Sequence, residues 1–562
     1  MSEEKRPIGR TKGPGESPHE FTFVSPDSDH SLRIGEFITY DAEVDGLPRT
    51  IFGRVVERRP LRLFPDAFAS DPSIEPGKVA EMVGYKQAEH ELFELTATVL
   101  GYYDERLGDF INPRIPPHEG RPIHLGSDEE LSRVLTKRRF GEIGSAHIGS
   151  LLTREAGHVP VVLDLSAITS THLAVIANTG AGKSYLSSVL VEELMKPANR
   201  AAILIVDPHG EYDTLVEMMN DQAFLEEVYR PEVKIFKPGE VNVRIGALAE
   251  SDLYYLLPDL SERMAYVLGR AFRDVRRNSQ QERGNLENWT LAELEIRIRQ
   301  IGEGADEEDG NDRFAGTADA LIWRLDRIFQ HSVVFDDFKH LDLGELFRPG
   351  RCSVLQINEI DEREQQVMVA TLLRRLFMAR TQTEKGLASA GDEHHLPYPA
   401  FILLEEAHHF GPAGVDVVST KILKRILAEG RKFGIGIGLI SQRPGKLDSD
   451  ILSQCNTQFL LRIVNPVDQS RVAESIESVG RDLLRELPSL TKGQVIVAGE
   501  AVNTPLLCRV RERHTPHGAE SKDAPQAWVD YHGSIEEDWF ERESALPVDT
   551  PRRGKSKMFK SD

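Results

Sequence analysis

Residues 173–186 read L-A-V-I-A-N-T-G-A-G-K-S-Y-L, an apolar β-branched run followed by a glycine-rich turn and an amphipathic segment. Gly182, Lys183 and Ser184 supply the last three positions of the phosphate-binding pattern GxxxxGK[ST], and Ala177 stands where that pattern has its first glycine. The turn amides and the helix N-terminus do most of the anion binding, so this change leaves the chemistry possible. The stretch predicts a strand, a phosphate loop and a helix.

The side chains and amides of this loop are the expected nucleotide contacts. The ammonium group of Lys183 would reach the β- and γ-phosphates of ATP, and the hydroxyl of Ser184 would ligate Mg²⁺. The whole expected set is Thr179, Gly180, Ala181, Gly182, Lys183, Ser184 and Tyr185. The alternative is an ordinary glycine-rich turn before a helix, but the strand before it and the helix pattern after it favour a nucleotide site.

Length, charge and cysteine content limit the classes of protein that fit. A chain of 562 residues is too long for one hydrophobic core and suggests two or three domains. The net charge of -22 argues against a surface that coats nucleic acid, although a local basic lining remains compatible with it. Three cysteines without CxxC spacing, no apolar leader and no long apolar run predict a cytoplasmic protein with no membrane segment.

The N-terminal part of the chain differs from the rest in composition and in its pattern of apolar residues. Residues 1–20 are polar and rich in glycine and proline, which predicts a disordered tail. Residues 21–140 carry short β-type runs broken by turn residues, and Asp45-Gly46 is a hairpin signal between two of them. A small antiparallel β-barrel or sandwich is expected there. The runs are 33–40, 50–57 and 91–103.

After residue 141 strands alternate with helices, which predicts a parallel sheet with helices on both faces. Helical periodicity over 253–276 and 289–301, with an acidic loop at 302–313, predicts a helical insertion. A basic tail begins at Pro551; it is either a solvated tail or a contact for phosphate backbones. The expected segments are a first core part at 141–250, the insertion at 251–344, a second core part at 345–515 and a C-terminal extension at 516–562.

A second stretch, F-I-L-L-E-E-A-H-H at 401–409, is an apolar strand that ends in two acids. Sheet topology places the carboxyl ends of such strands at the ligand crevice. Glu405 takes the position that would hold Mg²⁺ through water, and Glu406 the position that would polarise the attacking water. The alternative is an acidic surface turn.

The next strand ends in I-S-Q-R-P, so Ser441 and Gln442 are placed where a γ-phosphate sensor would sit; a turn or helix-capping pair is the alternative. Asp207 also follows a buried strand, in V-D-P-H-G-E-Y. It could orient water or couple neighbouring subunits, and a helix N-cap role fits it comparably well.

Arg431 and Lys432 close a predicted helix in A-E-G-R-K-F-G. Cations near a helix C-terminus are favoured by its dipole, which is one explanation for them. The other is that Arg431 is an arginine finger that reaches the nucleotide of a neighbouring subunit. Hydrolysis would then require an oligomer.

Taken in order, A-N-T-G-A-G-K-S, V-D-P-H-G-E-Y, L-L-E-E-A-H-H-F, E-G-R-K-F-G and S-Q-R-P resemble the HerA family of DNA translocases, within the HerA–FtsK group. The resemblance implies an α/β fold with a RecA-like P-loop ATPase core, and a homohexamer that pumps double-stranded DNA. It implies a partner nuclease of the NurA kind, in resection of DNA ends, or another effector in anti-phage defence. The residues carried over are Lys183, Ser184, Asp207, Glu405, Glu406, Arg431 and Gln442.

Three functions remain open on the sequence. The first is an ATP-driven duplex DNA translocase. The second is a nucleotide-regulated ring scaffold that assembles and gates an effector enzyme, whose ATP turnover DNA would little affect. The third is a secretion or conjugation ATPase, against which the lack of a visible membrane anchor argues.

Overall fold

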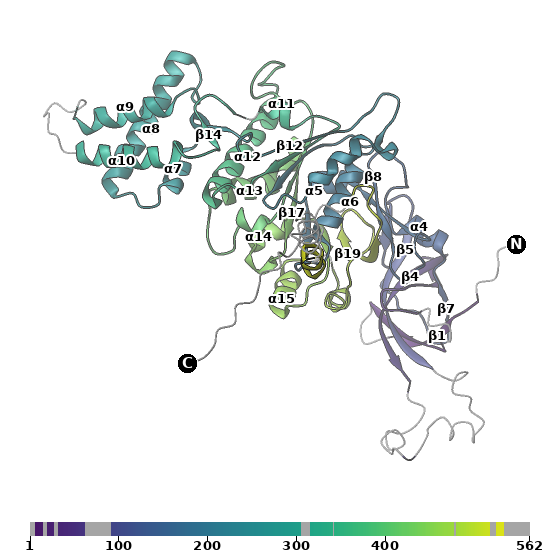
Figure 1. Cartoon of the computed structure of the whole chain (residues 1–562). Coiled ribbons are helices and arrows are strands. Elements are labelled where there is room, and N and C mark those ends of the chain that lie inside the picture. Colours follow the sequence, from purple (N-terminus) through teal and green to yellow (C-terminus); the bar gives the residue numbers. More distant parts are fainter. Residues whose placement is uncertain are drawn as a thin grey trace, which may run out of the picture. The chain divides into compact units, whose positions relative to one another are not determined.

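The computed structural model describes residues 6–14, 19–26, 32–61, 73, 92–304, 315–340, 342–476, 479–516 and 524–532 (Figure 1). Most of the acidic loop and the basic tail lie outside the described residues. The chain divides into two compact units, Met1–Pro516 and His517–Asp562. In the second unit, residues 524–532 are helical.

The N-terminal strands form an antiparallel barrel, as predicted. They follow the order β2-β1-β7-β3-β4-β5-β6, and an additional pairing of β2 with β5 closes the ring. Alternate residues of β5 point into a separate apolar core that contains Leu95, Ala97 and Val99. The strands are β1 (Gly9–Pro14), β2 (Glu20–Ser25), β3 (Phe37–Val44), β4 (Leu47–Pro60), β5 (Phe93–Asp104), β6 (Asp109–Ile111) and β7 (Pro122–Leu125).

The expectation of a disordered tail over 1–20 is wrong for Gly9–Pro14. This segment is β1, which pairs with β2 through Arg10↔Val24 and with β7 through Gly9↔Ile123. Without it, β2 and β7 would each present an unpaired edge. Pairing to two neighbours therefore outweighs a local composition that by itself disfavours a strand.

The hairpin signal at Asp45-Gly46 is confirmed. Val44 pairs with Leu47, so the two residues form the whole loop between β3 and β4. Both central residues have positive φ, 53° for Asp45 and 76° for Gly46, as a two-residue turn matched to strand twist requires.

The core is an eleven-stranded sheet in the order β12-β15-β11-β16-β17-β10-β18-β19-β20-β8-β9. The predicted parallel arrangement is confirmed from β12 to β18, and the remaining neighbours pair antiparallel. The strands are β8 (Ser145–Leu151), β9 (Pro160–Asp164), β10 (Leu173–Ile176), β11 (Ala202–Asp207), β12 (Glu232–Phe236), β15 (Arg351–Gln356), β16 (Ala400–Leu404), β17 (Ile435–Ser441), β18 (Thr457–Leu460), β19 (Gln494–Gly499) and β20 (Leu506–Val510).

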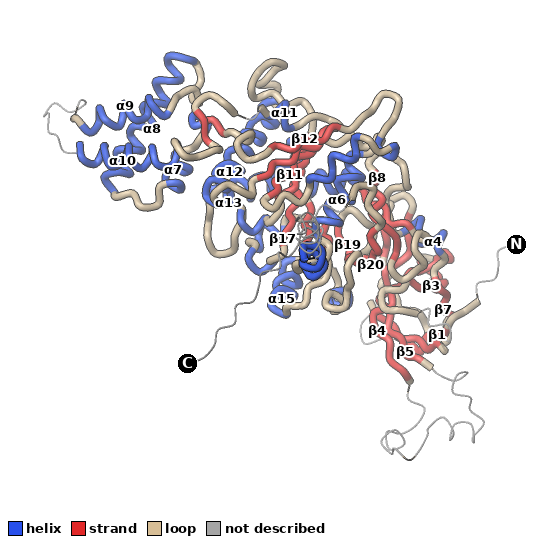
Figure 2. The backbone as a smooth tube through the Cα atoms, viewed as in Figure 1, coloured by secondary structure: helices blue, strands red, loops and turns tan. Residues whose placement is uncertain are grey.

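Helices cover both faces of this sheet, which Figure 2 shows as the large group of red strands among blue helices. In β10, Leu173 and Val175 join one apolar cluster, and Ala174 and Ile176 join the other. This alternation is the period-two pattern of a strand buried on both sides. Helices α5 (Leu165–Thr171) and α6 (Lys183–Met195) pack in the first cluster, and α12 (Glu362–Glu384) and α13 (Val418–Glu429) in the second.

The helical insertion is present, but the predicted helix over 253–276 is two helices. The chain breaks at Pro258, which cannot continue a helix, and the hydroxyl of Ser261 caps the second one. The ring of Phe272 meets that of Trp289 edge-on, with centroids 5.6 Å apart, inside the bundle. The helices are α7 (Glu250–Leu256), α8 (Glu262–Arg283), α9 (Leu291–Gly302), α10 (Ala315–Phe329) and α11 (Leu343–Leu346), beside the short strands β13 (Val243–Arg244) and β14 (Phe335–Asp336).

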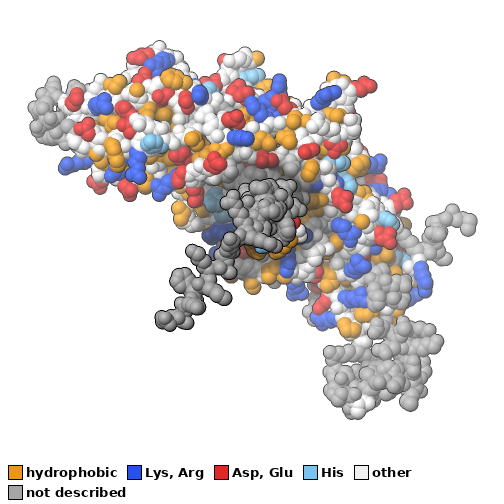
Figure 3. Space-filling model, viewed as in Figure 1, with side chains coloured by type: hydrophobic (Ala, Val, Ile, Leu, Met, Phe, Trp, Pro, Cys, Tyr) orange, Lys and Arg blue, Asp and Glu red, His pale blue; other side chains and the backbone are white. Residues whose placement is uncertain are grey.

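Shorter helices complete the described chain: α4 (Asp128–Val134), α14 (Ser449–Ser453), α15 (Pro466–Ser475) and α16 (Arg481–Leu484). Within the described ranges, no helix combines the length and the apolarity that a membrane crossing requires. Acidic and basic side chains lie intermixed over the described part of the face drawn in Figure 3.

Candidate active site

The phosphate loop has the predicted local structure. Strand β10 ends at Ile176, and α6 begins at Lys183. Gly180 and Gly182 have φ values of 76° and 101°, a region that glycine enters without steric cost. Ala177, in contrast, is not among the residues with positive φ; it is buried, and its N–H donates to the carbonyl of Ser441. This position therefore has no conformational need for glycine.

The two acids predicted at the end of β16 meet the loop lysine. The Nζ atom of Lys183 lies 2.7 Å from Oε2 of Glu405 and 3.1 Å from Oε1 of Glu406. Both carboxylates are 2% exposed, and β16 lies beside β11 and β17 in the sheet. Two adjacent buried carboxylates are tolerable here because one ammonium group is shared between them.

Burial and charge oppose each other in this cluster. Burial raises the pKa of Glu405, although the Lys183 ammonium and the Tyr212 hydroxyl act to lower it. Burial also lowers the pKa of Lys183, but the attraction of the two carboxylates outweighs that effect and the pKa is raised. The lysine is thus held as a cation that can pass from carboxylates to another anion.

Glu406 is held in a backbone conformation that is rare for its residue type. Its φ and ψ are 49° and 46°, the left-handed region, where a residue with a side chain is strained. Its Oε2 atom is buried, and no described group makes a hydrogen bond to it. Strain together with an unmet buried acceptor is typical of a residue kept for chemistry.

Two residues that the sequence analysis did not assign complete this cluster. The Tyr212 hydroxyl donates to Oε1 of Glu405 over 2.5 Å, and burial raises the pKa of Tyr212, so it stays a donor. The Ser184 hydroxyl donates to a carboxylate oxygen of Glu211. Glu211 and Tyr212 both lie in the V-D-P-H-G-E-Y stretch that ends β11 and follows it. This motif was the sequence signal that could have identified them. Hydroxyl and carboxylate oxygens are the ligands that Mg²⁺ prefers, so Ser184, Glu211 and Glu405 fit that ion.

The proposed sensor also reaches the loop. The Thr179 hydroxyl donates to Oε1 of Gln442 over 2.7 Å, which joins the end of β17 to the phosphate loop. Ser441, before it, is buried. Of the other loop residues, Gly180 is exposed, Ala181 is buried, and the Tyr185 hydroxyl accepts from the N–H of Arg513.

Asp207 lies at the end of β11, where its carboxylate holds the following turn. It is buried and accepts from the backbone N–H groups of His209, Gly210 and Tyr212 at 3.1, 2.8 and 3.3 Å. Asp207 therefore holds a turn and is not a helix N-cap, since the next helical segment, Asp213–Met219, begins after Tyr212. The same contacts position the segment that carries Glu211.

We expect Asp207→Ala to lower the free energy of unfolding by about 1–3 kcal/mol, because buried N–H groups lose their acceptor. Urea denaturation followed by circular dichroism measures this change. Asp207→Asn, which keeps one acceptor oxygen, should lose less. Unchanged stability of the alanine variant together with lost ATP hydrolysis would instead favour a role in catalysis.

Arg431 does not join its own chain's site. It lies exposed on the 3-10 helix Gly430–Phe433, which precedes β17, whereas Gln442 follows that strand. The 7 residues of β17 separate the two, a span of about 20 Å at the usual rise per residue. Within one chain, this span separates Arg431 from Gln442 and from the phosphate loop that Gln442 contacts.

The segment that follows β20 braces the phosphate-loop helix. Arg511 donates to Glu192 at 2.9 Å and to Glu193 at 2.8 Å, and both carboxylates on α6 are almost fully buried. The N–H of Thr515 also donates to Glu192, at 2.9 Å. The sequence offered no signal for these contacts, because they join residues more than 300 positions apart.

Arg511→Met should lower the free energy of unfolding by about 3–5 kcal/mol, because it removes the close cation of the buried Glu192 and leaves Glu193 with Lys196 alone. The matched control is Arg200→Met, since Arg200 pairs with Glu226 on the surface, where side chains are 48% and 56% exposed. We expect about 0–1 kcal/mol for that control. Equal losses in chemical denaturation would contradict the bracing role.

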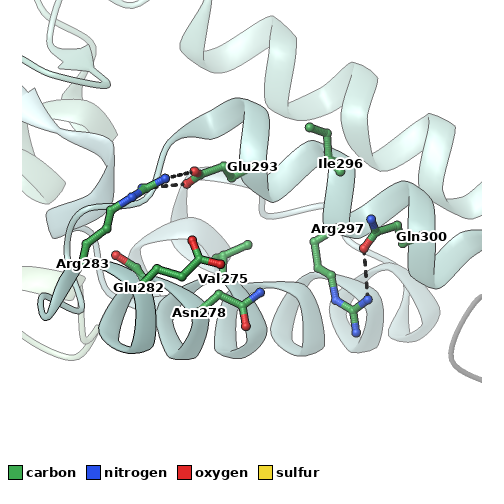
Figure 4. A pocket seen from close by; sticks show the side chains of 9 residues that line it. Val275, Asn278, Glu282, Arg283, Glu293, Ile296, Arg297 and Gln300 are labelled. Carbon is green, nitrogen blue, oxygen red and sulfur yellow. Dashed lines mark hydrogen bonds and ion pairs between the residues drawn. The ribbon is translucent and has the colours of Figure 1, made fainter.

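A cavity in the helical insertion, shown in Figure 4, lies between α8 and α9 and has a volume of about 220 Å³. Both of its arginines have partners: Arg283 pairs with Glu293, and Arg297 donates to the amide oxygen of Gln300 at 3.2 Å and pairs with Asp274 at 2.8 Å. No residue of the phosphate loop lines this cavity, and neither does Glu405 or Glu406.

A lysine on the glycine-rich loop after β10 faces two acids at the end of β16, a parallel strand separated from β10 by β17 alone. This arrangement defines an ATP-hydrolysing enzyme of the P-loop class. Residues 146–376 match the sequence model of the helicase HerA central domain. A probable helicase of Methanocaldococcus jannaschii is 30% identical over 485 residues, which cover 81% of this chain and 87% of that protein. The chain belongs to the HerA family of helicases.

Another relative is also similar over most of the chain. The DNA double-strand break repair helicase HerA of Pyrococcus furiosus is 29% identical over 463 residues, covering 76% of this chain and 79% of that protein. Among solved structures, VirB4 of Thermoanaerobacter pseudethanolicus aligns with a TM-score of 0.47 and 14% identity, covering 67% of this chain and 98% of that one. The last likeness is too distant to add to the assignment.

Proposed function

We propose that this protein is an ATP-driven translocase and helicase of double-stranded DNA that works as a homohexameric ring. The observation that carries the proposal is the contact of Lys183 with Glu405 and Glu406, in a chain of a helicase family. That arrangement suits nucleotide cleavage, and relatives bear the name of DNA break repair helicases.

In the proposed cycle, Lys183 leaves the two carboxylates when the phosphates of ATP arrive and pairs with them instead. The loop amides between Thr179 and Ser184 cradle the phosphate oxygens. Ser184 and Glu405, with Glu211 nearby, would hold Mg²⁺, which neutralises charge on the phosphates. Tyr212 keeps Glu405 oriented through its hydrogen bond.

Glu406 accepts the proton of the attacking water once Lys183 has left it. Its buried, strained position places a carboxylate beside the loop, where a general base must lie within hydrogen-bond reach of the water. Gln442, tied to Thr179, senses whether the γ-phosphate is present. Asp207 shapes the turn that carries Glu211.

Arg431 completes the site from the neighbouring subunit. Its exposure, and its place at the opposite end of β17 from Gln442, suit a cation that acts between subunits. It would stabilise the charge that develops on the phosphates, so hydrolysis would depend on ring assembly. The ring would sit in the cytoplasm with a NurA-like nuclease or another defence effector, for DNA end resection or anti-phage defence.

The rate of ATP hydrolysis with duplex DNA, single strands or no DNA tests this proposal, with oligomer size measured alongside by sedimentation. We expect strong stimulation by duplex that weakens steeply with salt, because the ring contacts backbone charge. Indifference to all DNA would favour the ring scaffold over the motor.

A further inference from the structure

We propose that His408 is a positioning residue that holds the Glu406 carboxylate through Nδ1 while Lys183 is engaged with phosphate. The inference rests on the proposed role of Glu406 and adds the group that keeps it aimed. His408 lies on the 3-10 helix Ala407–His409 directly after the two acids, and it is buried.

The geometry places His408 on the open side of the carboxylate. Its Nδ1 atom is 3.3 Å from Oε2 of Glu406, the buried atom to which no described group makes a hydrogen bond. The other oxygen, Oε1, has Lys183 at 3.1 Å and the half-exposed His209 at 3.6 Å. Oε2 therefore has His408 as its near polar neighbour.

ATP binding creates the need for this contact. Lys183 is the cation that Glu405 and Glu406 share, and it cannot serve both carboxylates and phosphates fully. When it leaves, a buried acid without a donor would be destabilised or would turn away from the water. A hydrogen bond from a neighbouring N–H would keep Glu406 ionised and in place.

His408 is suited to give one directed hydrogen bond. Burial lowers its pKa below the usual value, so the ring is neutral near pH 7 and carries a proton on one nitrogen. The same Nδ1 atom lies 3.3 Å from the Ser441 hydroxyl at the end of β17. Nδ1 can thus make its hydrogen bond either with Ser441 or with Glu406. This choice links the strand that carries the sensor to the catalytic carboxylate.

The neighbouring histidine provides a matched control. His408 and His409 have ring centroids 4.5 Å apart and line the same cavity of about 350 Å³. However, the Nδ1 atom of His409 lies 2.9 Å from Glu362, whose side chain is exposed. Changes at His409 alter the same cavity without touching the carboxylate.

The test compares two polar variants that differ in where they place an amide. His408→Asn puts its amide near the position of Nδ1, and His408→Gln extends it toward that of Nε2. We expect the asparagine variant to keep kcat within about threefold of wild type, and the glutamine variant to lose about 10- to 100-fold. KM for ATP and the melting temperature should be similar in both, and His409→Gln should behave as wild type.

Equal kcat values for the asparagine and glutamine variants, at any level, would overturn the positioning role, and so would a loss of ATP affinity that parallels the loss of kcat. The wild type and Glu406→Gln, assayed in parallel, keep the two ideas separate. If wild type hydrolyses ATP and Glu406→Gln does not, the proposed site stands whichever way His408 behaves.

Discussion

Glu406→Gln is expected to lower the rate of ATP hydrolysis by about 10²- to 10⁴-fold, the usual contribution of a general base. The amide is close in size to the carboxylate but cannot take up the proton of the attacking water. ATP affinity should be kept or increased, because Lys183 loses one of the two anions that compete with phosphate for it. Single-turnover hydrolysis and equilibrium binding of a fluorescent ATP analogue measure the two effects separately.

Glu362→Gln is the matched control for this substitution. Glu362 is also an acid near the site, yet its side chain is 63% exposed and pairs with His409 rather than Lys183. We expect its hydrolysis rate to equal that of the wild type. Full activity of Glu406→Gln, or equal losses in both variants, would mean that another group activates the water.

Arg431→Ala should reduce hydrolysis by about 10³- to 10⁵-fold in rings, the range found for arginine fingers. The adjacent Lys432 is exposed on the same short helix, so Lys432→Ala is the control and should leave the rate nearly unchanged. ATP binding by Arg431→Ala should also be unchanged, because the phosphate loop of each subunit is intact.

A mixing experiment separates a role between subunits from a role within one. Lys183→Ala and Arg431→Ala are each expected to be inactive alone, but mixed rings contain interfaces that pair an intact loop with an intact Arg431. Activity should therefore return on mixing. If Arg431→Ala hydrolyses ATP at the wild-type rate, or if mixing restores nothing, the trans-acting cation is wrong.

The local parts of the fold follow from local patterns. The strand, loop and helix around Lys183 are present, because β-branched residues and glycines each act within a few positions. The expectation of an amphipathic segment after the loop is wrong, since every residue of α6 from Leu186 to Met195 is buried. The turn at Asp45-Gly46 was predictable because Asp and Gly readily adopt the positive φ angles that it requires. The apolar run before the two acids is likewise a strand, β16.

The wrong predictions of secondary structure arose either from pairing with distant strands or from a helix-breaking residue that was overlooked. Pairing with β2 and β7 makes Gly9–Pro14 a strand despite its composition, and such pairing is not visible in the segment itself. Pro258, in contrast, was a visible signal against one helix over 253–276. The antiparallel half of the large sheet joins β8 and β9 to β19 and β20, strands from opposite ends of the core, so periodicity does not reveal their pairing.

The candidate site was predictable in part. Strand ends at one edge of a parallel sheet brought Lys183 to Glu405 and Glu406, and Thr179 to Gln442. The residues that hold these groups in place could not be predicted. Hydrogen bonds such as that of Tyr212 with Glu405 depend on side-chain placement across nearly two hundred residues.

The central claim is that two subunits build one hydrolytic site around a ring that holds duplex DNA. Electron cryomicroscopy of the full chain with a non-hydrolysable ATP analogue and a DNA duplex tests it most directly. The account predicts closed rings, with Arg431 of one subunit at the γ-phosphate held by Lys183 of the next, and duplex in the central channel. Single chains, or rings with Arg431 turned away from every nucleotide and no duplex inside, would contradict it.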